Sequence, residues 1–76
     1  MIPMVNWGIL GASQVAKRRC LAIEQAPNAA VVAVSSGKLA KAQHFVRDLR
    51  LGRCMAYGSY NDMLKDDDVH VVYIAV

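Results

Sequence analysis

The sequence predicts an α/β fold in which a doubly wound parallel sheet has the element order β-α-β-α-β-α-β. Three observations support this prediction: four short apolar runs recur along the 76 residues, segments with helical periodicity separate them, and a glycine directly follows the first run. Strands that alternate with helices form parallel sheets with right-handed crossovers. We expect the spatial strand order 3-2-1-4, with a ligand at the carboxyl end of the first strand.

The first strand is expected at residues 4–10, where the apolar run MVNWGIL suits a strand buried on both faces. Gly11 follows with a tight turn. From residue 13 to residue 26 the period changes, and Pro27 ends the predicted helix. One side of that helix carries the residues that return every three or four positions: Val15, Ala16, Arg19, Cys20, Ala22, Ile23 and Ala26.

The second strand is expected at residues 29–35, a continuous run rich in valine that Ser36 and Gly37 interrupt. A second helix is expected from residue 38 to residue 51, and Gly52 is placed to cap its C-terminus. Its predicted apolar stripe consists of Leu39, Ala42, Val46 and Leu49.

The remaining elements are shorter. Residues 54–57 suit a third strand, and Ser59 can cap a helix over residues 60–64, with Asp62 as the acidic partner of a capping box. Residues 66–68 form a polar turn, and residues 69–76 are a fourth apolar run.

The segment Gly11–Ala16 reads G-A-S-Q-V-A against the dinucleotide fingerprint G-x-G-x-x-G/A. Gly11 permits the sharp turn, and Ala16 is small enough for the helix to pack closely on the strand. Ser13 replaces the middle glycine, and its hydroxyl is a candidate donor to phosphate. The helix that starts here offers unpaired N–H groups and a positive dipole end to an anion. The alternative is a tight turn without a ligand.

The end of the second strand bears on the choice of cofactor. Enzymes that prefer NAD place an Asp or Glu there to accept hydrogen bonds from the ribose 2′-hydroxyl. The segment Ser35–Lys41 has no acid, and it offers Ser36, Gly37, Lys38 and Lys41. Hydroxyl and ammonium groups suit a 2′-phosphate, which favours NADP over NAD. The alternative is an ordinary solvated loop.

Charge and cysteine content exclude several classes of protein. The net charge of +3 owes much to Lys17, Arg18 and Arg19, which we interpret as a solvated helix face rather than a nucleic-acid patch because no aromatic residues are interleaved. We expect no signal peptide, because the N-terminus lacks a basic region followed by an apolar stretch, and no apolar run approaches the roughly 20 residues that span a bilayer. Cys20 and Cys54 form no C-x-x-C pair, which indicates reduced thiols and a cytoplasmic protein, with Cys20 in the core.

No metal site is expected. His44 lies on a helix without a second ligand nearby, which indicates a surface residue. His70 follows the polar turn without acidic partners on its strand and is interpreted as structural or partly exposed. The three aspartates at 66–68 lack the further ligands of a calcium loop. Trp7 and Tyr73 fall inside apolar strands and are predicted to be core residues.

Five segments carry a family resemblance: WGILGASQVA at 7–16, PNAAVVAVSS at 27–36, Lys41-Ala42, AYGSY at 56–60 and DDVHVVYIA at 67–75. In this order and spacing they resemble the N-terminal, NAD(P)-binding Rossmann domain of the Gfo/Idh/MocA family, named after glucose–fructose oxidoreductase and inositol dehydrogenase. The fold class is therefore a partial Rossmann-like sheet.

The resemblance implies a two-domain NAD(P)-dependent oxidoreductase, or dehydrogenase, that acts on sugars, polyols or diols. Its pyrophosphate would lie along Gly11, Ala12, Ser13, Gln14 and Val15. Ser36, Gly37 and Lys41 match the pattern that binds the 2′-phosphate of NADP, although many relatives have an Arg where Gly37 stands. Ile74 and Ala75 would run beneath the ribose on the nicotinamide side.

The family's later elements have no counterpart in the chain. These elements are a Pro/Asn-containing loop, a Lys in an acid-Lys-Pro motif and a substrate domain with a catalytic His. The resemblance therefore implies that residues 1–76 are a fragment, the N-terminal part of the dinucleotide-binding domain, with no catalytic residue and no turnover alone. The alternative is a non-catalytic relic or interaction module that pairs, or self-associates, through the edge of its fourth strand.

Overall fold

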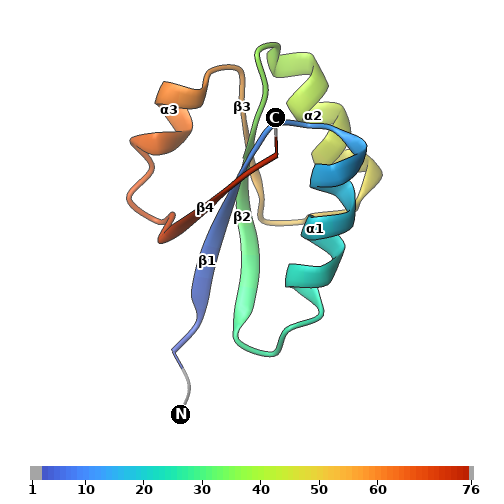
Figure 1. The fold of residues 1–76 in the computed structure, drawn as a ribbon. Coiled ribbons are helices and arrows are strands. Elements are labelled where there is room, and N and C mark those ends of the chain that lie inside the picture. Colours follow the sequence, from blue (N-terminus) through green and yellow to red (C-terminus); the bar gives the residue numbers. More distant parts are fainter. Residues whose placement is uncertain (1–2, 76) are drawn as a thin grey trace.

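The structure, a computed structural model, describes residues 3–75, and its strands form one parallel sheet in the order β3-β2-β1-β4 (Figure 1). The fold class and the strand order predicted from the sequence are confirmed. Along the chain the elements are β1 (Val5–Leu10), α1 (Gln14–Glu24), β2 (Ala29–Ser35), α2 (Leu39–Asp48), β3 (Met55–Tyr57), α3 (Tyr60–Leu64) and β4 (Val71–Ile74).

Helices cover both faces of the sheet, as in a doubly wound fold. Helices α1 and α2 lie on one face and the short α3 lies on the other (Figure 1). On the α3 face Met63 is fully buried against Gly8, where an added Cβ would lie 3.2 Å from the Met63 sulfur. The larger core cluster is made by Ile9, Ala16, Cys20, Val31, Val34, Ala42, Phe45, Leu51 and Ala75.

The predicted apolar stripes of the two long helices are correct only in part. Ala16, Cys20 and Ala42 are buried as expected, but Val15 and Leu39 are about half exposed. Both exposed residues belong to the first turn of their helix, next to the carboxyl edge of the sheet. The apolar stripe predicted for α2 also omits Phe45, an aromatic residue that is buried.

The end of α2 differs from the prediction. The helix ends at Asp48, and the residue with a left-handed backbone is Arg50, with φ 56°, rather than Gly52. The amide of Arg50 donates to the carbonyl of Arg47 and that of Leu51 to the carbonyl of Val46, the two bonds of a Schellman motif. The expected glycine cap is wrong because burial of Leu51 fixes where the chain turns.

The capping box predicted for α3 does not form. Ser59 is the N-cap residue, but its side chain makes no cap hydrogen bond. Instead, the Tyr57 hydroxyl donates to Asp66 Oδ2 at 2.6 Å, and Asp66 Oδ1 accepts from the Asp68 amide at 2.9 Å. These bonds join the end of β3 to the turn before β4, the predicted polar turn.

Strand β4 is shorter than predicted. It spans Val71–Ile74, and the last residue of the predicted run, Val76, lies outside the described residues. Trp7 and Tyr73 are half-buried rather than core residues. Arg19 Nε donates to the Tyr73 hydroxyl at 3.1 Å, and its guanidinium lies 5.8 Å from the ring centroid. The exposed His70 accepts a hydrogen bond from the Asn6 amide through Nδ1.

Candidate functional site

The connection from β1 to α1 makes the sharp turn that the sequence predicts. Gly11 has φ 115°, a conformation that residues with a Cβ rarely adopt, and its amide donates to the Ser35 carbonyl at 2.9 Å. Ala16 is fully buried, which allows α1 to pack closely on the sheet. The first and last positions of the fingerprint therefore have the geometry expected of them.

Ser13 is the N-cap of α1, and its hydroxyl is engaged on both sides. It accepts a hydrogen bond from the Ala16 amide at 3.2 Å and donates one to the Ala75 carbonyl at 3.1 Å. This differs from the expectation that the hydroxyl donates to a phosphate, because a hydroxyl has a single proton to donate. A phosphate at this turn would meet the backbone amide of Ser13 instead.

Four consecutive backbone amides at the start of α1 are free to bind an anion. Within residues 3–75, no group accepts a hydrogen bond from the N–H of Ala12, Ser13, Gln14 or Val15. Unpaired amides and the positive end of the helix dipole together make a helix N-terminus an anion-binding site. The chain thus presents a set of donors directly after the glycine turn.

The connection from β2 to α2 begins beside this turn. The buried Ser36 accepts a hydrogen bond from the Lys38 amide at 3.5 Å through its hydroxyl, and its own amide donates to the Tyr57 carbonyl at 3.0 Å. Gly37 is exposed, and a Cβ added to it would meet nothing within 4 Å. The start of a side chain at this position would therefore meet no obstruction. Lys38 and Lys41 are exposed.

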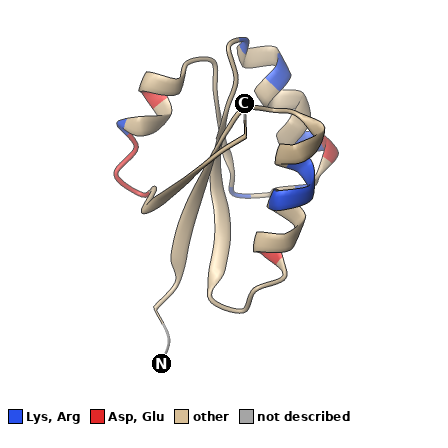
Figure 2. Cartoon of the chain, viewed as in Figure 1, with Lys and Arg blue, Asp and Glu red and all other residues tan. Residues whose placement is uncertain are grey.

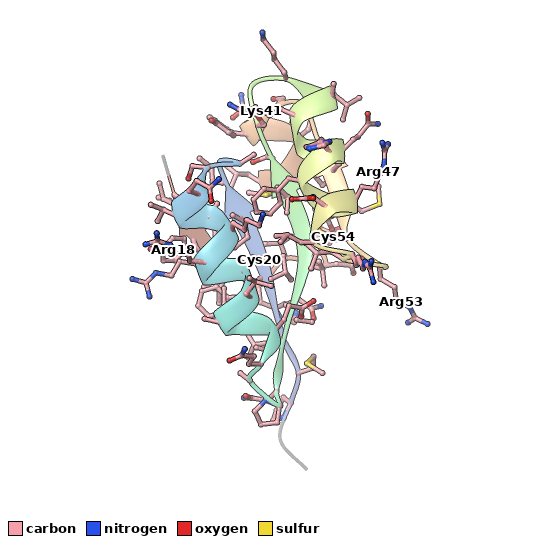
Figure 3. All side chains as sticks on the ribbon, turned by 90° about the vertical axis from the view of Figure 1, so that its right-hand side faces the viewer. Arg18, Cys20, Lys41, Arg47, Arg53 and Cys54 are labelled. Carbon is pink, nitrogen blue, oxygen red and sulfur yellow. The ribbon has the colours of Figure 1, made fainter. Side chains whose placement is uncertain are left out.

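A groove of about 390 Å³ lies between the start of α1 and the adjoining side of α2. Across it, Lys17 Nζ and Asp48 Oδ2 form an ion pair at 3.1 Å. Figure 3 shows Lys41 and Arg47 leaving α2 in different directions, with Arg47 pointing away from α1. The groove, called the α1–α2 groove below, is lined by Ala12, Ser13, Gln14, Lys17, Lys41, His44, Phe45 and Asp48.

Sequence reasoning identified the α1 residues and Lys41 but missed the other side of this groove. His44 is exposed, as predicted, yet it borders the same space as Lys41. The signal was available in the spacing, because positions 41, 44 and 48 share one face of a helix. What the spacing does not reveal is that this face looks toward α1 rather than toward open solvent.

Charges are unevenly distributed over the two sides of the sheet. Most basic residues lie on α1 and α2, which also carry Glu24 and Asp48, whereas α3 and the turn that follows it carry Asp62, Asp66, Asp67 and Asp68 next to Lys65 (Figure 2). The basic set on the first side is Lys17, Arg18, Arg19, Lys38, Lys41, Arg47 and Arg50. An anion approaching the chain is therefore attracted toward the side that carries the free amides.

The two candidate residues near the end of β4 have different surroundings. Ala75 is buried, its amide donates to the Leu10 carbonyl at 2.9 Å, and its carbonyl accepts from Ser13. Ile74 has 67 % of its surface exposed. The structure therefore brings Ala75 to the start of α1, whereas the Ile74 side chain faces solvent.

Other reactive groups play no part in this arrangement. Burial raises the pKa of the Cys20 thiol to about 11 and that of the Cys54 thiol to about 12, so both are protonated near neutral pH. Cys20 is fully buried, as predicted. Among residues 3–75, no three His, Cys, Asp or Glu side chains form a group that could hold a metal ion. In the same residues, no helix has the length and apolar character needed to cross a membrane.

Comparison with known proteins agrees with this geometry. A family model described as an oxidoreductase family with an NAD-binding Rossmann fold matches residues 5–76. The chain belongs to this family, Gfo/Idh/MocA. Similar curated members include trans-1,2-dihydrobenzene-1,2-diol dehydrogenases: that of Danio rerio is 35 % identical over 72 residues, and that of Xenopus tropicalis is 33 % identical over 71 residues. These matches cover 92 % and 91 % of the chain.

Solved structures of family members share the fold. A 3-ketoreductase from Actinomadura kijaniata in complex with NADP superposes with a TM-score of 0.84 at 30 % identity, over 96 % of this chain and 23 % of that one. A myo-inositol dehydrogenase from Lactobacillus casei, in complex with NAD(H) and myo-inositol, gives 0.85 at 25 % identity, over 95 % and 21 %. The chain spans 21 % of the length of the curated relatives it matches.

Proposed function

We propose that this chain binds the adenosine half and the pyrophosphate of a nicotinamide dinucleotide, as part of an oxidoreductase. The observation that carries the proposal is the set of free amides on Ala12–Val15, which follows a glycine with φ 115°. A diphosphate needs several donors that converge on adjacent oxygens, and this turn supplies four consecutive amides that have no acceptor within residues 3–75. The donor set therefore fits the group that the family implies.

The end of β2 supports a preference for NADP. The segment Ser35–Lys41 contains no carboxylate that could accept from a ribose 2′-hydroxyl, and Lys38 and Lys41 are exposed and basic. Ser36 and the unobstructed Gly37 complete the predicted contact set. NAD stays the alternative, since the similar solved structures hold NADP in one case and NAD(H) in the other.

A bound nicotinamide supplies hydride transfer, and the part of this chain is to hold and orient the cofactor. Ala75, which is tied to Ser13, and Ile74 would lie beneath the ribose on the nicotinamide side. The contacts proposed for the cofactor come from backbone amides, serines and lysines, and none of them is assigned a proton transfer to a substrate. We therefore propose that the 76-residue chain alone binds cofactor without turnover.

For a longer protein that contains this domain, we propose a substrate that is a diol, a polyol or a sugar. The support comes from the similar dihydrodiol dehydrogenases, 3-ketoreductase and inositol dehydrogenase. An assay of such a protein with a panel of diols and sugars, read as NADPH or NADH formation at 340 nm, tests the substrate class. Turnover of simple monoalcohols with no turnover of diols or sugars would refute it.

The cofactor proposal is tested by recording amide chemical shifts of the ¹⁵N-labelled chain while NADPH or NADH is added. We expect the largest shifts at Ala12, Ser13, Gln14 and Val15, because these amides would gain a phosphate acceptor. The matched internal control is the start of α3, where Asn61 and Asp62 also have first-turn amides but do not line the α1–α2 groove. Absence of shifts at residues 12–15 with millimolar cofactor would refute the proposal.

The second candidate function is an interaction module, and one observation favours it. Among the residues described, β4 pairs only with β1, and this edge strand carries Ile74 and Val71, which have 67 % and 39 % of their surfaces exposed. Edge strands with exposed apolar residues pair readily with other chains. Light scattering over a range of concentrations tests self-association: Ile74→Lys should shift the chain toward the monomer if the edge mediates it.

A further inference from the structure

We propose that the α1–α2 groove receives the 2′-phosphate of the cofactor, and that Asp48 limits the affinity for it by pairing with Lys17. The inference rests on the proposed dinucleotide function and goes beyond it, because it assigns cofactor selectivity to a residue at the far end of α2. The ligand is a phosphate monoester, and its recognition depends on the balance of charges that face one groove.

The first step is the position of the groove. It begins at Ala12–Gln14, whose amides are free, and continues along the side of α2 that carries Lys41 and His44. A ribose attached to a pyrophosphate at those amides would lie near the end of β2, where α2 starts. Lys41 lies in the first turn of α2 and lines the groove, so a phosphate on the 2′-oxygen of that ribose would meet the groove at Lys41.

The second step is the charge of the groove. The charged side chains that face it are Lys17 from α1 and Lys41 and Asp48 from α2, and His44 is the further titratable group. Lys17 is held by Asp48 at 3.1 Å, and no carboxylate in residues 3–75 pairs with Lys41. Lys17, Lys41 and Asp48 together therefore present a net charge of one positive unit to a phosphate.

The third step is the unusual position of Asp48. It is the last residue of α2, where the helix dipole disfavours an acidic side chain. Its visible partner is the ammonium of Lys17 on the neighbouring helix. Both side chains are partly exposed, 40 % for Lys17 and 52 % for Asp48, so the pair is weak enough for a phosphate to compete for Lys17.

Removal of the carboxylate should therefore strengthen phosphate binding. In Asp48→Asn, Lys17 is released and the groove gains one positive unit. For partly screened charges a few ångströms apart we expect a rise of roughly three- to tenfold in NADPH affinity. The affinity for NADH should stay within about twofold, because NADH has a hydroxyl in place of the phosphate.

The experiment is calorimetric titration of the full chain with NADPH and NADH at low and moderate salt. Lys17→Met breaks the same ion pair as Asp48→Asn, yet it should lower the NADPH affinity instead of raising it. Lys41→Met should lower the NADPH affinity as well. Arg47→Met is the matched control: it removes a cation from α2 outside the groove and should leave the ratio of the two affinities unchanged.

Opposite effects of Asp48→Asn and Lys17→Met separate a charge effect from a structural one. If loss of the ion pair merely loosens the helices, both variants will weaken both cofactors alike, and the proposal is overturned. Far-UV circular dichroism and urea midpoints verify that each variant is folded. If NADPH and NADH bind with equal affinity and no variant in the groove changes either affinity, the groove assignment is overturned. The dinucleotide function then still stands.

Inorganic phosphate distinguishes the monoester site from the amides of α1. Competition by phosphate against NADPH, with little effect on NADH, supports a separate site in the groove. Equal competition against both cofactors places the phosphate at the shared pyrophosphate amides and overturns the proposal. Failure of both cofactors to bind the wild-type chain would refute the proposed function, and the groove assignment falls with it.

Discussion

The Ser13 hydroxyl lies 3.1 Å from the carbonyl oxygen of Ala75 and joins the start of α1 to the end of β4. The Ser13 hydroxyl oxygen also caps α1, because it accepts a hydrogen bond from the Ala16 amide. Dinucleotide fingerprints usually have glycine at this position so that a phosphate can approach bare backbone. Here the side chain turns toward β4 instead, which leaves the neighbouring amides open and makes Ser13 part of the support of the site.

Replacement of Ser13 should therefore cost stability. Ser13→Ala removes the helix cap and the bond to Ala75, and we expect the free energy of unfolding to fall by about 1–2 kcal/mol in urea denaturation. Ser59→Ala is the matched control, because Ser59 is also an N-cap but makes no cap hydrogen bond. Equal losses in the two variants would show that the Ser13 bonds are not what stabilises α1.

Gly11→Ala tests the turn. A Cβ in the left-handed region costs about 1–2 kcal/mol, and we expect a loss of this size in the free energy of unfolding. Cofactor-induced shifts at residues 12–15 should weaken at the same time, because relief of the strain would rotate these amides. Gly37→Ala serves as the control and should be close to neutral, since its added Cβ meets nothing within 4 Å. An unchanged unfolding midpoint for Gly11→Ala would contradict the strained turn.

Arg50→Gly should stabilise the chain. Arg50 holds φ 56° at the end of α2, where glycine is the residue with the least steric cost. We expect a gain of roughly 0.5–1 kcal/mol in urea denaturation, since the greater freedom of glycine in the unfolded chain offsets part of the relief. Gly52→Ala, two residues later, has no steric neighbour within 4 Å and is the comparison variant. If Arg50→Gly destabilised the chain, the arginine side chain would stabilise the folded state by more than its left-handed backbone conformation costs.

Ser35→Ala should also stabilise. Ser35 Oγ is fully buried at the end of β2, and within residues 3–75 it finds no hydrogen-bond partner. An unsatisfied buried hydroxyl costs about 1–3 kcal/mol, so its removal should raise the free energy of unfolding by roughly 1 kcal/mol. Ser36→Ala provides the contrast, because that hydroxyl accepts from the Lys38 amide and its loss should destabilise. Thermal denaturation of both variants gives the comparison.

The bond between Tyr57 and Asp66 should make stability depend on pH at both extremes. It lowers the pKa of Asp66 below 3.8, so the contribution of Asp66 is present above that pH and is lost as pH falls through the lower, folded-state pKa. It raises the pKa of Tyr57 from 10.0 to about 12, so that contribution is complete below pH 10 and is lost as pH rises through about 12. Urea midpoints of Tyr57→Phe should depend less on pH in both windows. An identical pH profile in the wild type and Tyr57→Phe would contradict this account.

The fold could be predicted because the sequence specifies it locally. Runs such as residues 29–35 are too apolar and β-branched for anything except a buried strand, and the structure has β2 at those residues. The roles of Gly11 in the sharp turn and of Ala16 in close helix packing could likewise be predicted from their small size. The hydrogen bond from Ser13 to Ala75 joins residues 62 positions apart, and the ion pair of Lys17 with Asp48 joins residues 31 positions apart. No local sequence pattern contains that information. The wrong prediction of a helix cap at Gly52 has a similar origin, because tertiary burial of Leu51 outweighed the local preference for glycine.

Gly58, in the turn after β3, fits against the start of α2 so closely that an added Cβ would lie 2.9 Å from Leu39 Cβ and 3.1 Å from its backbone nitrogen. Helices shift as rigid rods, so a side chain at residue 58 would push the whole of α2 and alter how Lys41 meets its neighbours across the groove. On the proposed groove assignment, selectivity for one coenzyme over another would therefore be sensitive to Gly58, a residue outside the groove lining. Substitutions outside the α1–α2 groove could then change cofactor selectivity during evolution.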